Sequence, residues 1–234
     1  MGPGKESQMT KEAAQVIKEA DLVIGYPVYV ELCRKAFPEK EYCSTPMRKE
    51  RERCRMALSQ AAEGKEVAMI CSGDAGIYGM AGLVLELYKD YPEVEVEVVP
   101  GITAAVSGAA LLGAPLMHDF AVISMSDILT PWGKIEKRLR LASEADFIIC
   151  LYNPCSKKRA DYLKKACDIM LESKAGDTVC GYVRQIGREG EEKKLLTLSE
   201  LREASVDMFT TVFIGNTQTK IMNGKMVTPR GYQL

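Results

Sequence analysis

Apolar and polar positions in the first half of the chain alternate between strand-length runs and helical spacing. The pattern predicts strands at 21–26, 67–71 and 94–99, helices at 44–65 and 77–88, and a loop and helix at 100–113. In the helix predicted at 44–65, Thr45 is a typical N-cap, Pro46 fits the first turn, and Gly64 is typical of the end. Strands separated by helices in this order predict a parallel sheet.

The second half of the chain has a different order. Apolar runs predict strands at 120–124, 146–152, 178–184, 194–198 and 209–215, with a helix at 156–174. The Asn223-Gly224 pair indicates a hairpin with a type I′ turn, because both residues accept positive φ. Hairpins together with crossovers predict a mixed sheet. We place a boundary within 114–119, which gives an N-terminal α/β domain at 1–115 and a C-terminal α/β domain at 116–234.

Composition narrows the functional classes. The 234 residues carry a net charge of −1, with 47% hydrophobic and 27% charged residues, as in ordinary globular proteins. The balanced charge gives no basic field for nucleic acid, and no apolar run reaches the roughly 20 residues that span a bilayer. We therefore expect neither nucleic acid nor a membrane as partner. The first ten residues have no apolar signal-peptide core.

Cysteine and histidine usage argues against a metal site. The chain has eight cysteines, none in a C-x-x-C pair, and a single histidine. Cys71, Cys150 and Cys180 lie in predicted strands, where a thiol behaves as a small apolar side chain. We expect no metal, no Ser-His-Asp triad, and reduced, mostly buried thiols in a cytoplasmic protein.

Two glycine-containing loops follow predicted strands. The sequence "SGDAG" occupies 72–76 and "PGITA" occupies 100–104. Loops at the carboxyl ends of parallel strands are where α/β proteins bind ligands. The spacing G-x-x-G-x-x-G at 73–79 does not match the dinucleotide fingerprint, and Asp74 would repel phosphates. A ribose, an amine or a cation suits this carboxylate better, although 72–76 could instead be a tight strand-to-helix turn with no ligand.

Several motifs resemble one known family. They are "GPG", "SGDAGIYGMAGLVLEL", "VVPGITAAVSGAALLGAPLMHDFAVISMSDILTPW", "LYNP", "GREGE", "GNTQT" and "MVTPRGY". Together they span nearly the whole chain and resemble the tetrapyrrole (corrin/porphyrin) methylases. The glycine loops are common to that family. The stretch 115–132, with "LYNP" and "GREGE", is similar to its precorrin-3B C(17)-methyltransferase branch in cobalamin biosynthesis.

The resemblance implies a two-domain α/β methylase that binds S-adenosylmethionine (SAM) in a cleft between the domains. By the family pattern, the cofactor site consists of Pro3, Ser72, Gly73, Asp74, Ile77, Thr103, Ala104, Tyr152 and Asn153. Family members normally begin with a short apolar strand before the first glycine loop, and this chain starts at "MGPG". The resemblance therefore implies an unfilled slot and an open sheet edge in the N-terminal domain.

The implied reaction is methylation of carbon 17 of precorrin-3B or cobalt-precorrin-3 with ring contraction to the precorrin-4 level, and S-adenosylhomocysteine as by-product. The resemblance also implies a homodimer. Ring contraction needs proton transfers, so we name His118, Asp119 and Asp127 as candidate catalytic residues. His118 could instead only tie the segment between the domains.

A precorrin carries many carboxylates, which arginines and hydroxyl groups can bind. The candidate substrate-binding residues are Ser124, Ser126, Thr130, Arg184 and Arg188. For Lys157, Lys158 and Arg159 we favour a solvated helix start. Two alternatives stay open: a tetrapyrrole methylase acting at another ring position, and a non-catalytic SAM- or tetrapyrrole-binding protein.

Overall fold

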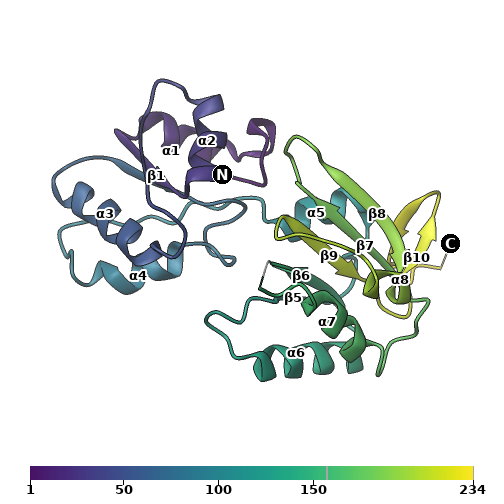
Figure 1. The fold of residues 1–234 in the computed structure, drawn as a ribbon. Helices are drawn as coiled ribbons and strands as arrows, with labels where there is room; N and C mark the ends of the chain where they lie inside the picture. The colour runs from purple at the N-terminus through teal and green to yellow at the C-terminus, as the bar shows by residue number, and fades with distance from the viewer. Residues whose placement is uncertain (157, 234) are drawn as a thin grey trace. The chain divides into compact units, whose positions relative to one another are not determined.

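A computed structural model describes residues 1–156 and 158–233 of the protein. The chain divides into two compact units, Met1–Thr103 and Ala104–Leu234, and each is described by itself (Figure 1). The division precedes the helix at Ala104–Leu112, whereas the boundary predicted from the sequence follows that helix. The helix belongs to the second unit because it packs on the strands there.

The first unit contains a three-stranded parallel sheet in the order β2-β1-β3. Its strands are β1 (Leu22–Gly25), β2 (Glu41–Ser44) and β3 (Val67–Ile70). Its helices are η1 (Glu6–Gln8), α1 (Lys11–Glu19), α2 (Pro27–Ala36), α3 (Glu50–Ala62) and α4 (Ala81–Tyr88). All four residues of β1 are buried, as expected for a parallel strand that is covered on both faces.

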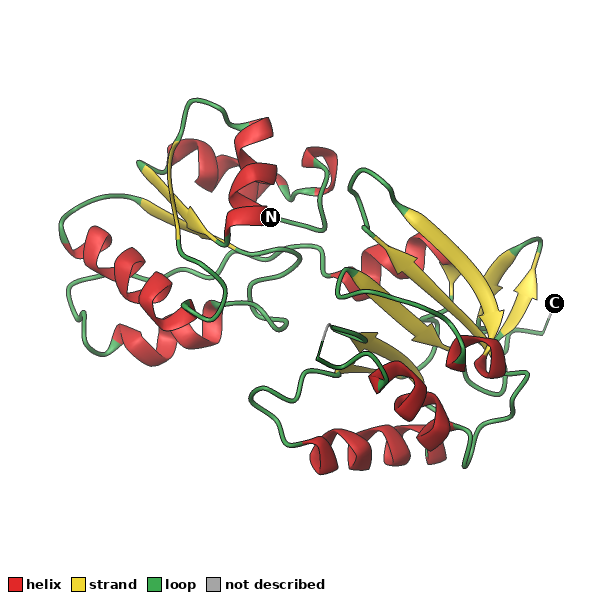
Figure 2. Cartoon of the chain, in the orientation of Figure 1, coloured by secondary structure: helices red, strands yellow, loops and turns green. Residues whose placement is uncertain are grey.

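The two faces of this sheet have separate apolar cores. Val23 packs with Ile17 of α1 and Phe37 after α2. The alternate residues Leu22 and Ile24 pack toward α3 on the other face. Figure 2 shows these helices flanking the short sheet. The predicted parallel sheet of the N-terminal part is therefore confirmed.

Two predicted helix starts and one predicted strand in the first unit are wrong. Helix α3 begins at Glu50, because residues Glu41–Ser44 pair with β1 and Arg48 adopts a φ of 69°. Helix α4 begins at Ala81 rather than residue 77, since Tyr78 has a φ of 54°. Residues 94–99 form no strand, because they pair with no other described strand.

The second unit contains a five-stranded mixed sheet in the order β5-β6-β9-β7-β8 and a small sheet in the order β10-β11-β4. The strands are β4 (Gly113–Ala114), β5 (Phe120–Ser124), β6 (Ile148–Tyr152), β7 (Val179–Arg184), β8 (Glu192–Thr197), β9 (Thr210–Ile214), β10 (Lys220–Met222) and β11 (Lys225–Val227). The helices are α5 (Ala104–Leu112), α6 (Trp132–Glu144), α7 (Tyr162–Met170) and α8 (Leu198–Arg202). The predicted mixed sheet is confirmed.

Helices cover both faces of the five-stranded sheet (Figure 2). On one face, α6, α7 and α8 bury Leu151 and Val212. On the other face, α5 packs against Cys150 and Phe213. Gly108 of α5 makes this close approach possible, because a Cβ there would lie 2.8 Å from the Phe213 ring.

Two local predictions in this unit have opposite outcomes. The Asn223-Gly224 turn is confirmed, with φ values of 50° and 71° between β10 and β11. The helix predicted at 156–174 is shorter, because regular helix begins only at Tyr162 and ends at Met170. Lys157, which falls in this prediction, lies outside the described residues.

Candidate active site

The turn after β3 is built from backbone and small side chains. Gly73 adopts a φ of 70°, which a side chain would oppose, and faces Gly2 with a φ of 67°. The two residues exchange backbone hydrogen bonds, with Gly2 N–H donating to Gly73 O at 3.1 Å and Gly73 N–H donating to Gly2 O at 2.8 Å. This pair fixes the "GPG" segment containing Pro3 against the turn at 72–76.

Asp74 joins this turn to the second glycine loop. Its Oδ1 accepts the N–H of Gly76 at 2.8 Å, and its Oδ2 accepts the N–H of Gly101 at 2.8 Å. Both carboxylate oxygens therefore bind backbone amides on two different loops. Asp74 is a predicted ligand-binding residue, and in the structure it also fixes the two loops relative to each other.

The second loop approaches the turn closely. A Cβ on Gly101 would lie 2.2 Å from the carbonyl oxygen of Gly73, so only glycine fits. The loop begins at Pro100, whose carbonyl accepts the Thr10 hydroxyl at 3.2 Å, and continues to the buried Thr103. Two loops from distant parts of the sequence thus present bare backbone at one place.

Apolar surface borders these two loops. Ile77 and Ile102 are exposed to 40% and 36%, which is high for isoleucine. Ser72 of the turn is half-buried. Exposed aliphatic side chains beside unhindered backbone groups fit a nucleoside, which presents a flat apolar ring and polar edges. The residues present in the first unit therefore fit an adenosyl cofactor.

The second unit brings several predicted residues to the carboxyl ends of β5 and β6. These strands are parallel, and Ser124 pairs in register with Tyr152. Asn153, which has a φ of 53°, donates from Nδ2 to the Ser124 Oγ at 3.1 Å. The backbone N–H of Ser126 also donates to that oxygen at 3.3 Å. The "LYNP" motif and the stretch around Ser124 thus form one polar cluster.

Tyr152 connects this cluster to the start of α5. Its hydroxyl oxygen accepts the N–H of Ala105, the second residue of that helix, at 2.7 Å. The first N–H groups of a helix have no partner within the helix, so this bond satisfies one of them. Tyr152 therefore fixes the chain just after Ala104, which the resemblance places in the cofactor site.

Asp127 lies in a small charged cluster that sequence reasoning missed in part. The Tyr162 hydroxyl donates to Asp127 Oδ2 at 2.7 Å, and Arg159 Nη1 lies 3.6 Å from Asp127 Oδ1. The hydrogen bond to Asp127 raises the pKa of Tyr162. The Arg159 side chain is only 14% exposed, and its buried Nη1 makes no hydrogen bond to the described residues. The prediction of a solvated Arg159 is wrong.

The remaining predicted residues of the second unit differ in their contacts and in their exposure to solvent. Arg184 ends β7 at the same sheet edge as Ser124, because β7 runs in the direction of β6, and it pairs with Glu192. Arg188 Cζ lies 5.7 Å from the centre of the Phe209 ring. The Nε2 of His118 is buried and has no hydrogen-bond partner among the described residues. Asp119 is exposed and Thr130 is half-buried.

The cysteines are free, as predicted. Six are buried: Cys33, Cys54, Cys71, Cys150, Cys167 and Cys180. Burial raises the pKa of the Cys150 thiol to about 12, so this thiol stays protonated and unreactive.

In the described part of the chain, no group of three or more histidine, cysteine or acidic side chains could hold a metal ion. Within the same residues, no helix has the length and hydropathy to cross a bilayer.

Comparison with known proteins identifies the family. A sequence profile of the tetrapyrrole (corrin/porphyrin) methylases matches residues 1–202. The chain is 49% identical over 235 residues to a probable cobalt-factor III C(17)-methyltransferase of Salmonella typhimurium, covering 100% of this chain and 98% of the relative. It is 38% identical to a precorrin-3B C(17)-methyltransferase of Sinorhizobium sp, covering 99% and 94%.

Longer relatives and solved structures agree. A cobalt-factor III methyltransferase of Priestia megaterium is 45% identical, and the chain spans 44% of its length. The crystal structure of the methyltransferase CobJ matches with a TM-score of 0.88 and 35% identity, covering 97% of this chain and 96% of the other. With the two glycine loops and the "LYNP" cluster, these matches show that the chain belongs to the tetrapyrrole (corrin/porphyrin) methylases.

Proposed function

We propose that the protein transfers a methyl group from SAM to carbon 17 of cobalt-factor III or its cobalt-precorrin-3 form, with contraction of the ring. The observation that carries this proposal is the 49% identity to the Salmonella typhimurium relative, which extends over the whole chain. The C(17)-methyltransferases of cobalamin biosynthesis belong to the same family as this chain. The expected by-product is S-adenosylhomocysteine.

The cofactor supplies an activated methyl group when it is bound, so the chain needs no covalent nucleophile. We assign its binding to Pro3, Ser72, Gly73, Asp74, Ile77 and Thr103 in the first unit, and to Ala104, Tyr152 and Asn153 in the second. Asp74 holds the turn at 72–76 and the loop at Gly101 in one arrangement. Rigid backbone donors that need no rearrangement on binding improve affinity and orientation.

Substrate binding is assigned to the polar cluster of the second unit. Ser124, Ser126 and Thr130 offer hydroxyl groups, while Arg184 and Arg188 offer guanidinium groups. Arg159 joins this set, since its buried Nη1 has no hydrogen-bond partner among the described residues and can donate a hydrogen bond to a substrate carboxylate. Asp127 lies beside that guanidinium and accepts the Tyr162 hydroxyl, which makes it a positioning residue for both side chains.

His118 is assigned to proton transfer during ring contraction. Its Nε2 is buried and makes no hydrogen bond to the described residues, so that nitrogen is available to a substrate group. A buried polar atom without a partner is costly, and a catalytic role is one explanation for its presence. The neighbouring Asp119 is exposed and follows His118 directly in sequence, and we assign it to the same step.

The experiment is a direct assay with two substrates. The protein is incubated with SAM and either cobalt-factor III or cobalt-free precorrin-3B, and the products are identified by mass and by NMR. We expect a methyl group on carbon 17 with the cobalt substrate. Of five relatives that are 40–49% identical to this chain, four are named as cobalt-factor III methyltransferases. The relative named as a precorrin-3B C(17)-methyltransferase is 38% identical.

Other outcomes of that assay would select the alternatives. Preferential turnover of precorrin-3B would assign the cobalt-free substrate. A methyl group at another ring carbon would assign a different position. Tight binding of SAM without any methylated product would assign a non-catalytic binding protein.

Two further properties are proposed, a homodimer from the resemblance and a cytoplasmic location from the free thiols. The protein is expected to form a homodimer, which sedimentation equilibrium measures directly. It is also expected to act in the cytoplasm, which cell fractionation tests. A monomer, or enrichment in a membrane fraction, would overturn the corresponding proposal.

A further inference from the structure

One arginine of the first unit is buried and only partly satisfied by hydrogen bonds. Arg53 of α3 is 3% exposed. Its Nη2 donates to the backbone carbonyl oxygens of Thr45 at 2.9 Å and Pro46 at 3.3 Å. Its Nε is buried and makes no hydrogen bond to the described residues. The guanidinium therefore lies beside the segment that leads into α3, with donor capacity left over.

The acidic residues closest to Arg53 in sequence do not neutralise it. The first turn of α3 contains Glu50 and Glu52. Glu52 pairs with Lys49 at 3.0 Å, and the Glu50 carboxylate accepts the backbone N–H of Arg48 at 3.1 Å. A buried cation without a counter-charge is costly, so its presence in a folded protein calls for an explanation.

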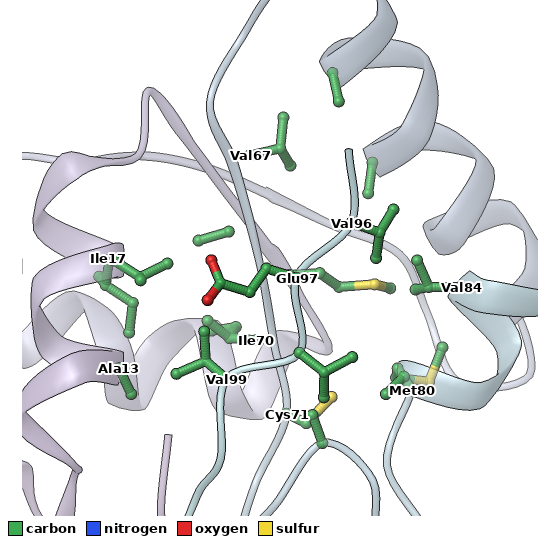
Figure 3. Close-up of a pocket in the computed structure, with 18 of the residues that line it drawn as sticks. Ala13, Ile17, Val67, Ile70, Cys71, Met80, Val84, Val96, Glu97 and Val99 are labelled. Atoms are coloured by element: carbon green, nitrogen blue, oxygen red, sulfur yellow. The ribbon is translucent and has the colours of Figure 1, made fainter. Parts of the chain in front are cut away.

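The carboxylates near the end of β3 do not neutralise Arg53 either. Burial raises the pKa of the Cys71 thiol, and the positive charge of Arg53 opposes that rise, so the two side chains lie within electrostatic range. Asp74 is also in range of Cys71, but its two oxygens accept amides of both glycine loops. Figure 3 shows the Glu97 carboxylate directed toward Ile17 and away from Cys71.

Arg53 lies at the edge of the sheet where a ligand is expected. Thr45 directly follows β2, and Tyr26 directly follows β1. The centre of the Tyr26 ring is 5.7 Å from the Arg53 Cζ. Since β1 pairs in parallel with both β2 and β3, the turn at 72–76 after β3 is at the same edge. Parallel α/β sheets bind ligands beyond the carboxyl ends of their strands.

The amino end of α3 adds positive potential at this place. The helix has 13 residues, and no side chain caps its N-terminus at Lys49. The first N–H groups of a helix attract anions, and the helix dipole disfavours a cation there. Arg53 is the fourth residue of α3, so its charge lies near the positive end of that dipole. A buried guanidinium and an uncapped helix end together favour an anion.

We propose that Arg53 and the amino end of α3 bind a carboxylate group of a ligand at this edge of the sheet. The carboxylate would supply the missing counter-charge and accept charge-assisted hydrogen bonds. Two ligands of the proposed function carry such groups: the amino-acid part of SAM, and the side chains of the tetrapyrrole. The choice of these two ligands rests on the proposed function, whereas the need of Arg53 for an anion does not.

The cofactor is tested with SAM and decarboxylated SAM, which differ by the carboxylate alone. Isothermal titration compares the parent with Arg53→Met, which keeps the length of the side chain and removes its charge. Arg51→Met is the matched control, because Arg51 is exposed on the same helix. If Arg53 binds the cofactor carboxylate, the parent prefers SAM by about 30-fold or more, and only Arg53→Met loses that preference. A merely structural role would weaken both compounds equally.

The tetrapyrrole is tested with uroporphyrin III, which carries eight carboxylates and binds without turnover. If Arg53 binds a tetrapyrrole carboxylate, Arg53→Met raises the dissociation constant by about tenfold or more in a fluorescence titration. Arg51→Met should change it by less than about twofold, and Arg53→Lys, which keeps the charge, should restore part of the loss. Equal behaviour of Arg53→Met and Arg51→Met in both tests would overturn the proposal. Neither test measures methyl transfer, so a protein that methylates nothing would overturn the proposed function alone.

A second variant keeps the test decisive if Arg53→Met does not fold. Met47 is 51% exposed and directly follows Pro46, whose carbonyl oxygen accepts Arg53. Met47→Glu places a competing carboxylate before α3, and Met47→Gln is its uncharged control. We expect Met47→Glu to raise the melting midpoint and to weaken binding of SAM or uroporphyrin III by about fivefold or more relative to Met47→Gln. Equal affinities of the two variants for both compounds would count against the site.

Discussion

The Asp74 carboxylate and the Gly101 amide are joined by a 2.8 Å hydrogen bond across 27 residues of sequence. Asp74 accepts the Gly76 amide with its other oxygen, so one side chain holds both glycine loops. Gly101 in turn allows no side chain, since a Cβ would lie 2.2 Å from Gly73 O. The shape of the candidate cofactor site therefore depends on this pair.

The first prediction concerns Asp74→Ala. Removing the carboxylate leaves the amides of Gly76 and Gly101 without their acceptor and frees the second loop. We expect the dissociation constant for SAM to rise by about 100-fold or more, which corresponds to about 2.7 kcal/mol, and the free energy of unfolding to fall by only about 1 kcal/mol. Isothermal titration and denaturant melting measure the two quantities. Asp74→Asn keeps one oxygen that can accept an amide hydrogen bond and is the matched control. Its dissociation constant for SAM and its free energy of unfolding should lie between those of the parent and of Asp74→Ala. Proportional losses in both quantities would argue for a purely structural role.

The second prediction concerns His118→Ala. Its Nε2 has no described partner to lose, so we expect little change in stability and in the dissociation constant for SAM. Formation of the ring-contracted product should slow by about 10²-fold or more, the usual contribution of an acid–base group. Single-turnover assays followed by mass spectrometry measure this rate. An unchanged rate would remove His118 from the mechanism, and a pH–rate profile that His118→Gln leaves unaltered would do the same.

Some of the fold could be predicted from local sequence. The strand at 120–124 has the predicted bounds, because its apolar run is flanked by polar residues. The Asn223-Gly224 turn was predictable because few residue pairs accept positive φ twice in succession. These features depend only on neighbouring residues.

Features that depend on distant partners could not be predicted in this way. β2 (Glu41–Ser44) is a half-exposed edge strand whose polar sequence gives no strand signal. Residues 94–99 have a strong strand pattern but pair with none of the described strands. The glycine loops could be predicted as a candidate ligand site, but the Asp74–Gly101 hydrogen bond could not, since nothing local marks a partner 27 residues away. Arg159 was misjudged because its charged neighbours suggested solvent, whereas Asp127 and Ser156 hold its side chain.

The third prediction concerns Arg159→Gln. If its buried guanidinium binds a substrate carboxylate, loss of the charge removes a charge-assisted interaction worth about 1.5–3 kcal/mol. We expect KM for the tetrapyrrole to rise by about 10- to 100-fold with little change in the dissociation constant for SAM. Steady-state kinetics and titration separate these effects.

Two neighbouring variants serve as controls for Arg159. Tyr162→Phe removes the hydroxyl that Asp127 accepts, but keeps the ring that packs on Trp132. Tyr162→Phe should raise KM for the tetrapyrrole by less than Arg159→Gln does, since Asp127 can still orient the Arg159 guanidinium. If Arg159→Gln changes only the melting midpoint, then the cluster is structural and substrate carboxylates bind elsewhere.

The last prediction is a pH dependence of stability that centres on Asp146 and Lys174. Burial raises the pKa of Asp146, but hydrogen bonds from Thr217 and the charge of Lys174 outweigh it, so the net pKa is lowered. The Lys174 side chain is 3% exposed, and its Nζ lies 3.4 Å from Asp146 and 3.1 Å from Gly215 O. A carboxyl group whose folded pKa is lowered stabilises the protein above its unfolded pKa. That contribution is lost as the pH falls toward the folded value.

The variant Asp146→Asn isolates this contribution. Asparagine tolerates the φ of 55° at this position and keeps a hydrogen-bond acceptor for Thr217, but leaves the buried Lys174 charge unpaired. We expect the free energy of unfolding to fall by about 1–3 kcal/mol at pH 7, with a smaller difference between variant and parent near pH 3. Urea melts across this pH range measure the difference, and Lys174→Met in both backgrounds is the matched comparison. A gap that stays constant with pH would mean that the charge of Asp146 contributes nothing, and that its hydrogen bonds to Thr217 carry the whole effect.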